Sequence, residues 1–480
     1  MTLRGESGAG AAAFIGQAIL AGTAAALNAA LMSPKRWARP GLALMGLAMV
    51  GPGEARGAPI LARASAWDAL DLSGVGADFL ILAEPSSQPL VARAVLRRAA
   101  EARLKVLLLE TDGLRRLAIG DLIGRPLGAA DGNDLRGLIA GRRVLITGGG
   151  GSIGAELARQ VAALGPARLT LLDSSEFNLF KIGHDLPDAA LALADVRDPA
   201  ATRRWFARER PHLVFHAAAL KQVPLVESFP SEGVLTNVIG LRHVAKAAGA
   251  AGADLIFVST DKAVDPSGVM GASKRLGELY CQALDREAGR GGGPRALPVR
   301  LGNVLGSAGS VTPIFESQLA QGGPLTVTDA AVTRFFLSIP QAANFLLHAA
   351  AIGVGAECAR GAAFVTDMGE ALAVVDLARK IIRLAGLRPE IDIPITFVGL
   401  RPGEKLHERL VAADEWREPD PAPGVMAAAS RPRGLAELDE IVDRLALLAC
   451  AGADAEVVAA LFAAVAPASA KQSESQRAAG

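Results

Sequence analysis

The chain contains few of the residues that build disulfide-rich, metal-binding or aromatic-rich domains. Its three cysteines, Cys281, Cys358 and Cys450, are odd in number and widely spaced, which fits reduced cytosolic thiols and neither a disulfide framework nor a zinc site. The six histidines show no ligand spacing, so we expect no metal. Aromatic residues make up only 4% of the sequence, whereas 53 glycines accompany abundant alanine. This composition favours closely packed helices and sheets over an aromatic-rich sandwich.

The chain also has no excess of positive or negative charge. The chain has 50 Lys and Arg against 49 Asp and Glu, a net charge of +1, and no long basic stripe. The sequence therefore argues against nucleic acid as a partner. Hydrophobic residues make up 51% of the 480 positions, which argues against disorder and is enough for the cores of two or three domains.

A charge-free segment over residues 8–34 is long enough to span a bilayer. It consists mostly of alanine, glycine, threonine, asparagine and glutamine, which are weak membrane formers, so a buried helix explains it equally well. A signal peptide is disfavoured because Arg4 is the only early positive charge and Glu6 follows it. We expect a cytoplasmic protein, with peripheral contact at the inner membrane and a single N-terminal transmembrane helix both left open.

Residues 1–125 have the pattern of an imperfect α/β unit. The pattern predicts strands over 78–84 and 104–110, with a helix over 91–103 between them. Glycine, proline and aspartate then indicate a linker, which we place at 126–140.

A stronger α/β unit follows, and it predicts a doubly wound parallel sheet of the Rossmann type. Short apolar runs alternate with helical or turn sequence, as βα units require. We assign residues 141–415 to this domain, including a small substrate lobe beyond about 305, and 416–480 to a helical extension and polar tail. The predicted strands are 142–148, 168–173, 190–195, 212–219, 254–260 and 296–304.

A glycine-rich loop joins the first of these strands to a helix. Glycines there permit a tight turn and let backbone N–H groups approach a pyrophosphate at the helix N-terminus. The next strand ends in Asp173, which is placed to accept hydrogen bonds from a ribose 2′-hydroxyl and to repel a 2′-phosphate. This favours NAD over NADP, and Asp195 at the end of the third strand is placed to meet the adenine. The loop residues assigned to the cofactor are Gly148, Gly151, Ser152, Ile153 and Gly154.

The fifth strand ends in Ser259-Thr260-Asp261-Lys262, and Lys274 follows on the next helix. Short-chain dehydrogenases place a Ser or Thr at this strand end and a Tyr-x-x-x-Lys on that helix, with both side chains on one face. Here Met270 occupies the tyrosine position, and a thioether cannot shuttle a proton. The only tyrosine, Tyr280, is six residues past Lys274 and is predicted to point away. From these residues alone, a dead enzyme or a dinucleotide sensor stays open.

Six motifs, in order, resemble the large bacterial UDP-N-acetylglucosamine 4,6-dehydratases of capsule and O-antigen synthesis, the CapD-like polysaccharide biosynthesis proteins. The resemblance covers about residues 140–415, and methionine in place of tyrosine is a trait of this large subclass. It implies an NAD-dependent lyase that acts on a UDP-N-acetylhexosamine, retains configuration at sugar C5 and forms homo-oligomers. The motifs are TGGGGSIG (147–154), LDSSEFNLF (172–180), HAAALKQVPLVESFP (216–230), STDKAVDPSGVMGASKR (259–275), RLGNVLGSAGSVTPIF (300–315) and GLRPGEKLHE (399–408).

The same resemblance assigns roles to individual residues. It implies an acid/base cluster of Thr260, Asp261 and Lys262, with Lys274 on the cofactor ribose and Met270 beside them. It also implies cofactor contacts and substrate contacts in the segments that flank this cluster. The implied cofactor contacts are Ala217 and Ala218, and the implied substrate contacts are Lys221, Glu227, Asn303, Arg334, Arg401 and Glu404.

One departure from the family concerns the N-terminal part. Full-length relatives carry several transmembrane helices and then a first Rossmann-like domain. Here a Gly-Ala-Gly at 8–10, followed by an expected helix, and the run 42–61 look like a degenerate form of that domain, without its first strand and third glycine. Three alternatives remain in view for the whole chain: a UDP-sugar 4-epimerase, a C5-inverting dehydratase, and a non-catalytic NAD-binding regulator. We also expect His216 to be a core histidine rather than a base.

Overall fold

The computed structural model describes residues 16–83, 89–117, 119–123, 132–355, 359–366, 368–422 and 424–466. The chain divides into two compact units. The first unit comprises Met1–Pro126, Ser310–Val332 and Leu372–Gly399, and the second comprises Leu127–Gly309, Thr333–Ala371 and Leu400–Gly480. Two segments that the sequence pattern placed in the catalytic domain, Ser310–Val332 and Leu372–Gly399, thus belong with the N-terminal residues.

The first unit is built on a six-stranded sheet in the order β3-β2-β1-β4-β5-β6. The first five strands are parallel, and β6 runs antiparallel to β5. Helix α1 (Ala24–Leu31) packs on one face, and α2 (Pro89–Glu101) packs on the other. The strands are β1 (Gly16–Gly22), β2 (Leu42–Val50), β3 (Ile60–Ala64), β4 (Phe79–Leu82), β5 (Lys105–Glu110) and β6 (Gly113–Arg116).

The N-terminal segment differs from its prediction as one long helix. Residues 16–22 form β1, between β2 and β4, and the α-helix in the described part of this segment covers 24–31. A strand covered on both faces has no polar side, so by pattern alone its apolar run cannot be told from a buried helix. The first strand of the Rossmann-like domain is therefore present, while the Gly-Ala-Gly at 8–10 lies outside the described residues. Across the described part of the chain, no helix is both long and apolar enough to cross a bilayer.

The second unit contains a nine-stranded sheet in the order β20-β21-β17-β12-β11-β10-β7-β8-β9. Strands β7 to β12 are parallel and adopt the doubly wound order in which the chain reverses direction between β7 and β10. Ligands of such sheets bind outside the carboxyl ends of the strands at this point. The six strands are β7 (Arg143–Thr147), β8 (Arg168–Asp173), β9 (Ala190–Leu193), β10 (Leu213–His216), β11 (Asp254–Thr260) and β12 (Ala296–Leu301).

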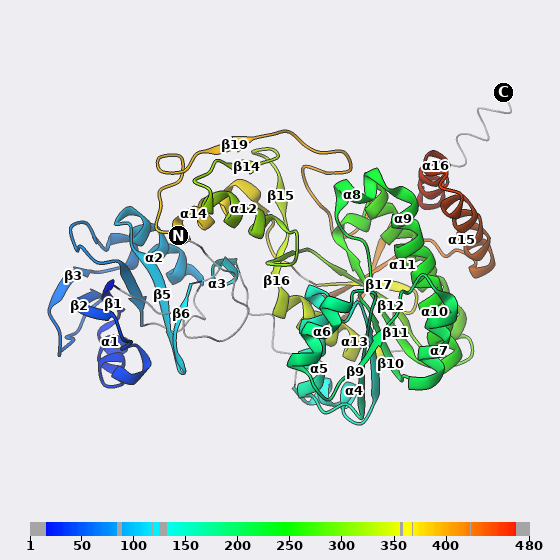
Figure 1. Ribbon diagram of the computed structural model, residues 1–480, viewed down its shortest axis with the longest axis horizontal. Helices are drawn as coiled ribbons and strands as arrows, with labels where there is room; N and C mark the ends of the chain where they lie inside the picture. The colour runs from blue at the N-terminus through cyan, green and yellow to red at the C-terminus, as the bar shows by residue number, and fades with distance from the viewer. Residues whose placement is uncertain are drawn as a thin grey trace. The chain divides into compact units, whose positions relative to one another are not determined.

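Helices cover both faces of this sheet (Figure 1). One face is covered by a group that includes α5 and α13, and the other by a group that includes α10 and α11. The apolar sides of these helices bury the sheet between two hydrophobic cores, which makes the strand ends rigid supports for side chains. The helices are α4 (Gly132–Ile139), α5 (Ser152–Ala163), α6 (Glu176–Asp185) and α13 (Ile339–Gly355) on the first face, with α7 (Pro199–Glu209), α10 (Leu241–Ala251) and α11 (Val269–Gly289) on the second.

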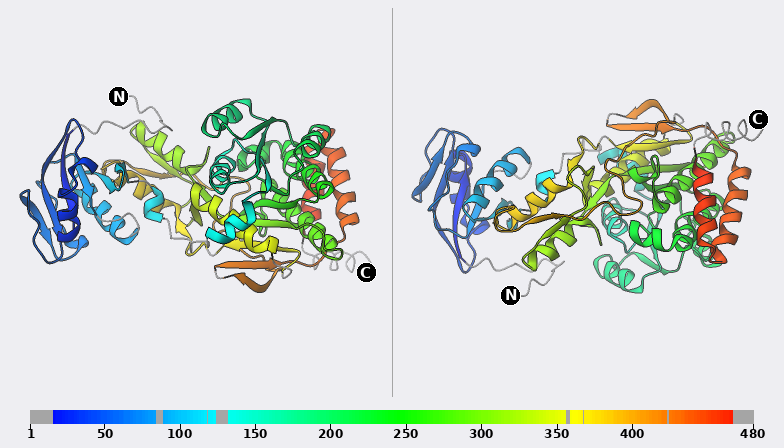
Figure 2. Two further views of the ribbon diagram at one scale, coloured as in Figure 1. Left: turned by 90° about the horizontal axis from the view of Figure 1, so that it is seen from below. Right: turned by 90° about the horizontal axis from the view of Figure 1, so that it is seen from above.

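The C-terminal part also departs from its prediction, because 416–429 are not helical. They form β20 (Trp416–Ala422) and β21 (Val425–Ala429). Strand β21 pairs antiparallel with β17 (Ala362–Thr366), and β20 pairs antiparallel with β21 at the edge of the sheet. Prolines within β20 suit its place at the sheet edge, where a missing N–H costs no ladder hydrogen bond. The expected helices follow as α15 (Leu435–Cys450) and α16 (Asp454–Val465), which lie side by side in Figure 2. The predicted strand over 296–304 divides into β12 and β13 (Asn303–Leu305).

Candidate active site

The glycine-rich loop leaves β7 and enters α5, as the spacing predicts. Gly148 has φ +66°, and a Cβ atom there would lie 2.7 Å from the backbone nitrogen of Ala218 and 2.8 Å from the carbonyl carbon of Ala217. At Gly154 a Cβ atom would collide with the carbonyl oxygen of Gly148. The loop thus packs directly on the segment after β10. Any side chain at Gly148 or Gly154 would prevent this close packing. Gly151 caps α5 without a side-chain hydrogen bond.

The two predicted acidic residues are held in different ways. Asp173 accepts hydrogen bonds through Oδ2 from the Gly150 N–H at 3.0 Å and through Oδ1 from the Ser175 N–H at 2.9 Å, so it stands beside the loop. Asp195 accepts from the Arg197 N–H at 2.9 Å and from the Arg197 guanidinium at 2.8 Å. Asp173 is therefore coupled to the glycine loop itself, whereas Asp195 is paired with a neighbouring arginine.

A cluster of polar side chains follows β11, where the sequence predicted the acid/base group. Thr260 donates from Oγ1 to Asp261 Oδ1 at 2.9 Å, and Lys262 Nζ donates to the same oxygen at 3.0 Å. Lys262 also donates to Asn303 Oδ1 at 2.6 Å. Asp261 is fully buried, and its Oδ2 has no hydrogen-bond partner within the described residues. The cluster therefore joins Thr260 and Lys262 through a single carboxylate oxygen, Oδ1 of Asp261.

Helix α11 presents Met270 and Lys274 one turn apart. Lys274 is buried, donates to the Val258 carbonyl at 3.0 Å and lies 4.7 Å from the centre of the Phe257 ring. Burial lowers the pKa of Lys274 to about 8. Tyr280 instead donates its hydroxyl to Asp439 at 3.1 Å, so the prediction that it points away from the site is confirmed.

Glu227 supports the start of α11. Its Oε1 accepts from the Val269 N–H at 2.6 Å, a capping contact that the helix lacks at its own N-cap, Gly268. Burial raises the pKa of the Glu227 carboxyl. A Cβ atom at Gly268 would lie 2.5 Å from Glu227 Oε1, and one at Gly403 would lie 2.8 Å from it. The two glycines thus let the carboxylate approach the helix.

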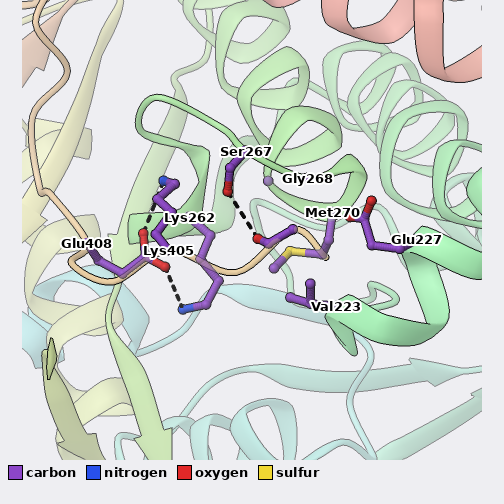
Figure 3. A pocket seen from close by; sticks show the side chains of 10 residues that line it. Val223, Glu227, Lys262, Ser267, Gly268, Met270, Lys405 and Glu408 are labelled. Atoms are coloured by element: carbon purple, nitrogen blue, oxygen red, sulfur yellow. Dashed lines mark hydrogen bonds and ion pairs between the residues drawn. The ribbon is translucent and has the colours of Figure 1, made fainter. Parts of the chain in front are cut away.

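A small pocket joins these elements (Figure 3). Three of its residues, Lys262, Met270 and Glu227, were predicted as site residues. Sequence reasoning missed Ser267, Lys405 and Glu408, although the last two lie in the motif 399–408, from which only Arg401 and Glu404 were carried over. The pocket is lined by Val223, Glu227, Lys262, Ser267, Gly268, Met270, Gly271, Gly403, Lys405 and Glu408.

The other predicted substrate contacts are dispersed. Lys221 donates to Ser307 Oγ at 3.2 Å, and burial lowers the pKa of Lys221. Arg401 is exposed, and its backbone N–H donates to the Glu404 carboxylate at 3.3 Å.

Arg334 is buried, and its guanidinium donates hydrogen bonds to backbone carbonyls. It donates to the carbonyls of Thr333 at 2.8 Å, Leu406 at 3.1 Å and Lys405 at 2.7 Å. In this structure Arg334 therefore holds the segment that carries Lys405 and Glu408.

A buried network of charges lies behind the cluster. Arg300 on β12 is fully buried and binds Glu278 on α11 at 2.6 Å and Glu415 at 2.8 Å. Ser259, the residue before Thr260, donates to Glu278 at 2.7 Å. The arginine partners lower the pKa of the Glu415 carboxyl to about 2 against the effect of burial. The network thus links Ser259, at the end of β11, to Glu415, which follows the pocket residues Lys405 and Glu408.

His216 ends β10 inside the core. It is fully buried, its Nδ1 lies 2.7 Å from Thr147 Oγ1, and burial lowers its pKa to about 3. Its complete burial confirms its prediction as a core residue, and an imidazole with so low a pKa is a poor proton acceptor at neutral pH.

The fold and the site define an α/β protein with a Rossmann-type sheet and the strand-end cluster and helix lysine of short-chain dehydrogenases. The chain belongs to the family described as "Polysaccharide biosynthesis protein", whose model matches residues 144–430. The predicted family is thereby confirmed.

Curated relatives support this membership. The chain is 41% identical over 310 residues to "Probable polysaccharide biosynthesis protein EpsC" of Bacillus subtilis (63% of this chain, 50% of the relative). It is 39% identical over 315 residues to "Capsular polysaccharide biosynthesis protein CapD" of Staphylococcus aureus (64% and 51%). The chain thus spans about half the length of these two relatives. A protein named "UDP-glucose 4-epimerase" from Rickettsia felis is 35% identical over 287 residues (58% and 80%).

Among solved structures, Pen from Bacillus thuringiensis is similar with a TM-score of 0.54 and 30% sequence identity. The similarity covers 61% of this chain and 87% of that one. It agrees with the α/β fold.

Proposed function

We propose that this protein is a UDP-N-acetylglucosamine 4,6-dehydratase that retains configuration at C5. Its product would be UDP-4-keto-6-deoxy-N-acetylglucosamine, a precursor for surface polysaccharide. The observation that carries the proposal is the Thr260-Asp261-Lys262 cluster, whose Lys262 lines the pocket together with Met270, the residue in place of the usual tyrosine. The names of the CapD and EpsC relatives agree with a role in polysaccharide synthesis.

The residues present fit NAD as the cofactor. The loop Gly148–Gly154 leaves the α5 N-terminus free of a side-chain cap, so its N–H groups suit a pyrophosphate. Asp173 beside the loop suits a ribose 2′-hydroxyl and opposes a 2′-phosphate, which favours NAD over NADP. Ala217 and Ala218 border the loop, and Lys274 would hold the nicotinamide ribose. When bound, NAD would accept a hydride from sugar C4 and return it to C6.

The chain's own residues would carry the protons. Loss of the C4 hydrogen as hydride and of the hydroxyl proton gives a ketone, which acidifies the C5 proton. Asp261 and Lys262 would serve C5 and C6, where one proton leaves, water departs and a proton returns. Arg401 and Lys221 would bind the diphosphate, because both side chains are cationic. Asn303, Arg334, Glu227 and Glu404 would complete or support the substrate site.

Of the alternatives, the 4-epimerase has a specific observation in its favour, the Rickettsia relative. Met270 opposes it, because an epimerase returns its hydride to C4 and more usually keeps the tyrosine for that proton transfer. A non-catalytic regulator would have no need for the buried, partly unsatisfied Asp261 beside Lys262.

The deciding experiment is incubation with UDP-N-acetylglucosamine in deuterated water, followed by mass spectrometry and proton NMR. We expect loss of one water and one deuterium at C5. An unchanged mass with a galacto-configured isomer would establish the epimerase instead. No reaction with NAD demonstrably bound, for this and other UDP-hexosamines, would favour the regulator.

A matched variant tests the role of the cluster. Lys262→Ala is expected to reduce turnover at least about a thousandfold, because it removes a proton-transfer group. NAD binding, measured by retained cofactor or fluorescence titration, should stay unchanged. Near-normal turnover in this variant would remove Lys262 from the mechanism.

A further inference from the structure

Glu408 lines the pocket, and the mechanism proposed above assigns no role to its carboxylate. Its side chain is 2% exposed, and it stands between two lysines, with Oε2 3.1 Å from Lys405 Nζ and Oε1 3.9 Å from Lys262 Nζ. Figure 3 shows dashed lines from this carboxylate to both amino groups. A carboxylate buried to this degree is stable as an anion only when cations compensate it.

The two lysines are not equivalent. Lys405 is fixed twice, by Glu408 and by the Val264 carbonyl at 2.6 Å. Lys262 lies at the longer distance from Glu408 and bonds to Asp261 and Asn303 in addition. Lys405 therefore forms the stronger ion pair with Glu408, and Lys262 has the weaker electrostatic interaction with the same carboxylate.

We propose that Glu408 and Lys405 are positioning residues that set the proton affinity of Lys262 in opposite directions. Glu408 stabilises the ammonium form of Lys262, and Lys405 opposes it by neutralising Glu408 and by its own charge. The catalytic meaning of this arrangement rests on the proposed function, in which one proton leaves C5 and one returns within each turnover. A group that does both must hold its proton neither too tightly nor too weakly.

Few charged groups surround Lys262. Those that face it are Asp261 on its own segment, Glu408 and Lys405 on the segment after residue 400, and Glu227 across the pocket. Asn303 is neutral. Among the described residues, Glu408 is the one carboxylate that contacts both Lys262 and a second cation. A change at Glu408 or Lys405 should therefore reach Lys262 through this carboxylate.

The test is an NMR titration of full-length protein with ¹³Cε-labelled lysine, with the Lys262 signal assigned by its loss in Lys262→Arg. Glu408→Gln should move the titration midpoint of Lys262 down by about one pH unit, and Lys405→Met should move it up. Glu408→Asp should preserve most of the wild-type midpoint. Glu440→Gln, an exposed change on α15, is the control and should move nothing.

Kinetics provide the second measurement. In Glu408→Gln the pH dependence of kcat should shift in the same direction as the midpoint, with KM for UDP-N-acetylglucosamine within about twofold of wild type. Midpoints that do not move, or that move together in Glu408→Gln and Lys405→Met, overturn the inference. If the midpoints move as expected but wild type leaves UDP-N-acetylglucosamine unchanged, the proposed function fails and the electrostatic coupling stands.

Discussion

The sheets of the two units share the order of their first six strands but differ at the first turn. In each, the first strand lies between the second and the fourth, and the third strand lies beyond the second. In the second unit β7 leads into four glycines, and α5 begins without a side-chain cap. In the first unit β1 leads into Gly22 and Thr23, and Thr23 Oγ1 accepts from the Ala26 N–H at the start of α1. A shared topology thus creates the crevice, while the turn decides whether its helix N–H groups face a ligand or the protein itself.

The largest expected effect contrasts charges buried in the second unit with charges exposed in the first. Arg300→Met leaves Glu278 and Glu415 with one cation fewer in the interior, so we expect a loss of roughly 3–5 kcal/mol in the free energy of unfolding. Arg97→Gln removes the exposed pair with Asp68 and should cost at most about 1 kcal/mol. Thermal unfolding compares the two. Equal losses would mean that the interior network is not holding the fold.

The next effect tests the turns directly. Gly154→Ala places a methyl group against the Gly148 carbonyl, which should deform the loop and weaken NAD binding at least about a hundredfold. Gly22→Ala is the matched change in the first unit, where the nearest atom would be the Ala83 methyl group at 3.3 Å. NADH fluorescence titration measures both. If Gly22→Ala were the variant that lost NAD, the assignment of the cofactor to the second unit would be wrong.

A smaller effect concerns pH. The pKa of His216 falls from its ordinary value of 6.5 to about 3 in the folded protein, so the unfolded chain binds the extra proton between these values. This contribution to stability is complete above pH 6.5 and decreases as the pH falls. Unfolding free energies at pH 7.5 and 5.5 should differ by about 1.4 kcal/mol from this residue. His216→Met should remove that part of the slope, and an unchanged slope would contradict the assignment.

The smallest effect sharpens the role of Thr23. Thr23→Ala removes the α1 cap and should cost about 1 kcal/mol, measured by denaturant unfolding. Turnover and NAD affinity should stay at wild-type values. A loss of NAD affinity would mean that NAD binds at the turn before α1, whose N–H groups we assign to the Thr23 cap.

The strands of the second unit could be predicted from sequence because their apolar runs are bounded by clear turns. Residues 168–173 and 254–260 form strands with the predicted bounds. The first strand of the first unit was missed, since a buried run of Ala, Ile and Leu lacks the alternation that distinguishes strand from helix. Likewise, the local pattern of 425–429 does not indicate that β21 pairs with β17, because that pairing is a long-range contact.

The site was predicted unevenly for the same reason. Residues on one strand end or one helix face, such as Asp261, Lys262 and Met270, follow from local geometry and family motifs. Lys405 and Glu408 enter the pocket only through tertiary contacts, and their segment is held by Arg334, whose backbone role no motif reveals. Sequence therefore locates the chemistry that belongs to one element and misses the groups that a distant segment adds.

The late position of that segment has a consequence for how the protein becomes active during synthesis. The pocket combines Glu227 with Lys405 and Glu408, and the network behind it requires Glu415. A ribosome that has completed the parallel strands β7 to β12 has produced Glu227 but not yet Lys405, Glu408 or Glu415. The nascent sheet can form first, as domains generally do during translation, but its active site is assembled only when nearly the whole described chain has emerged.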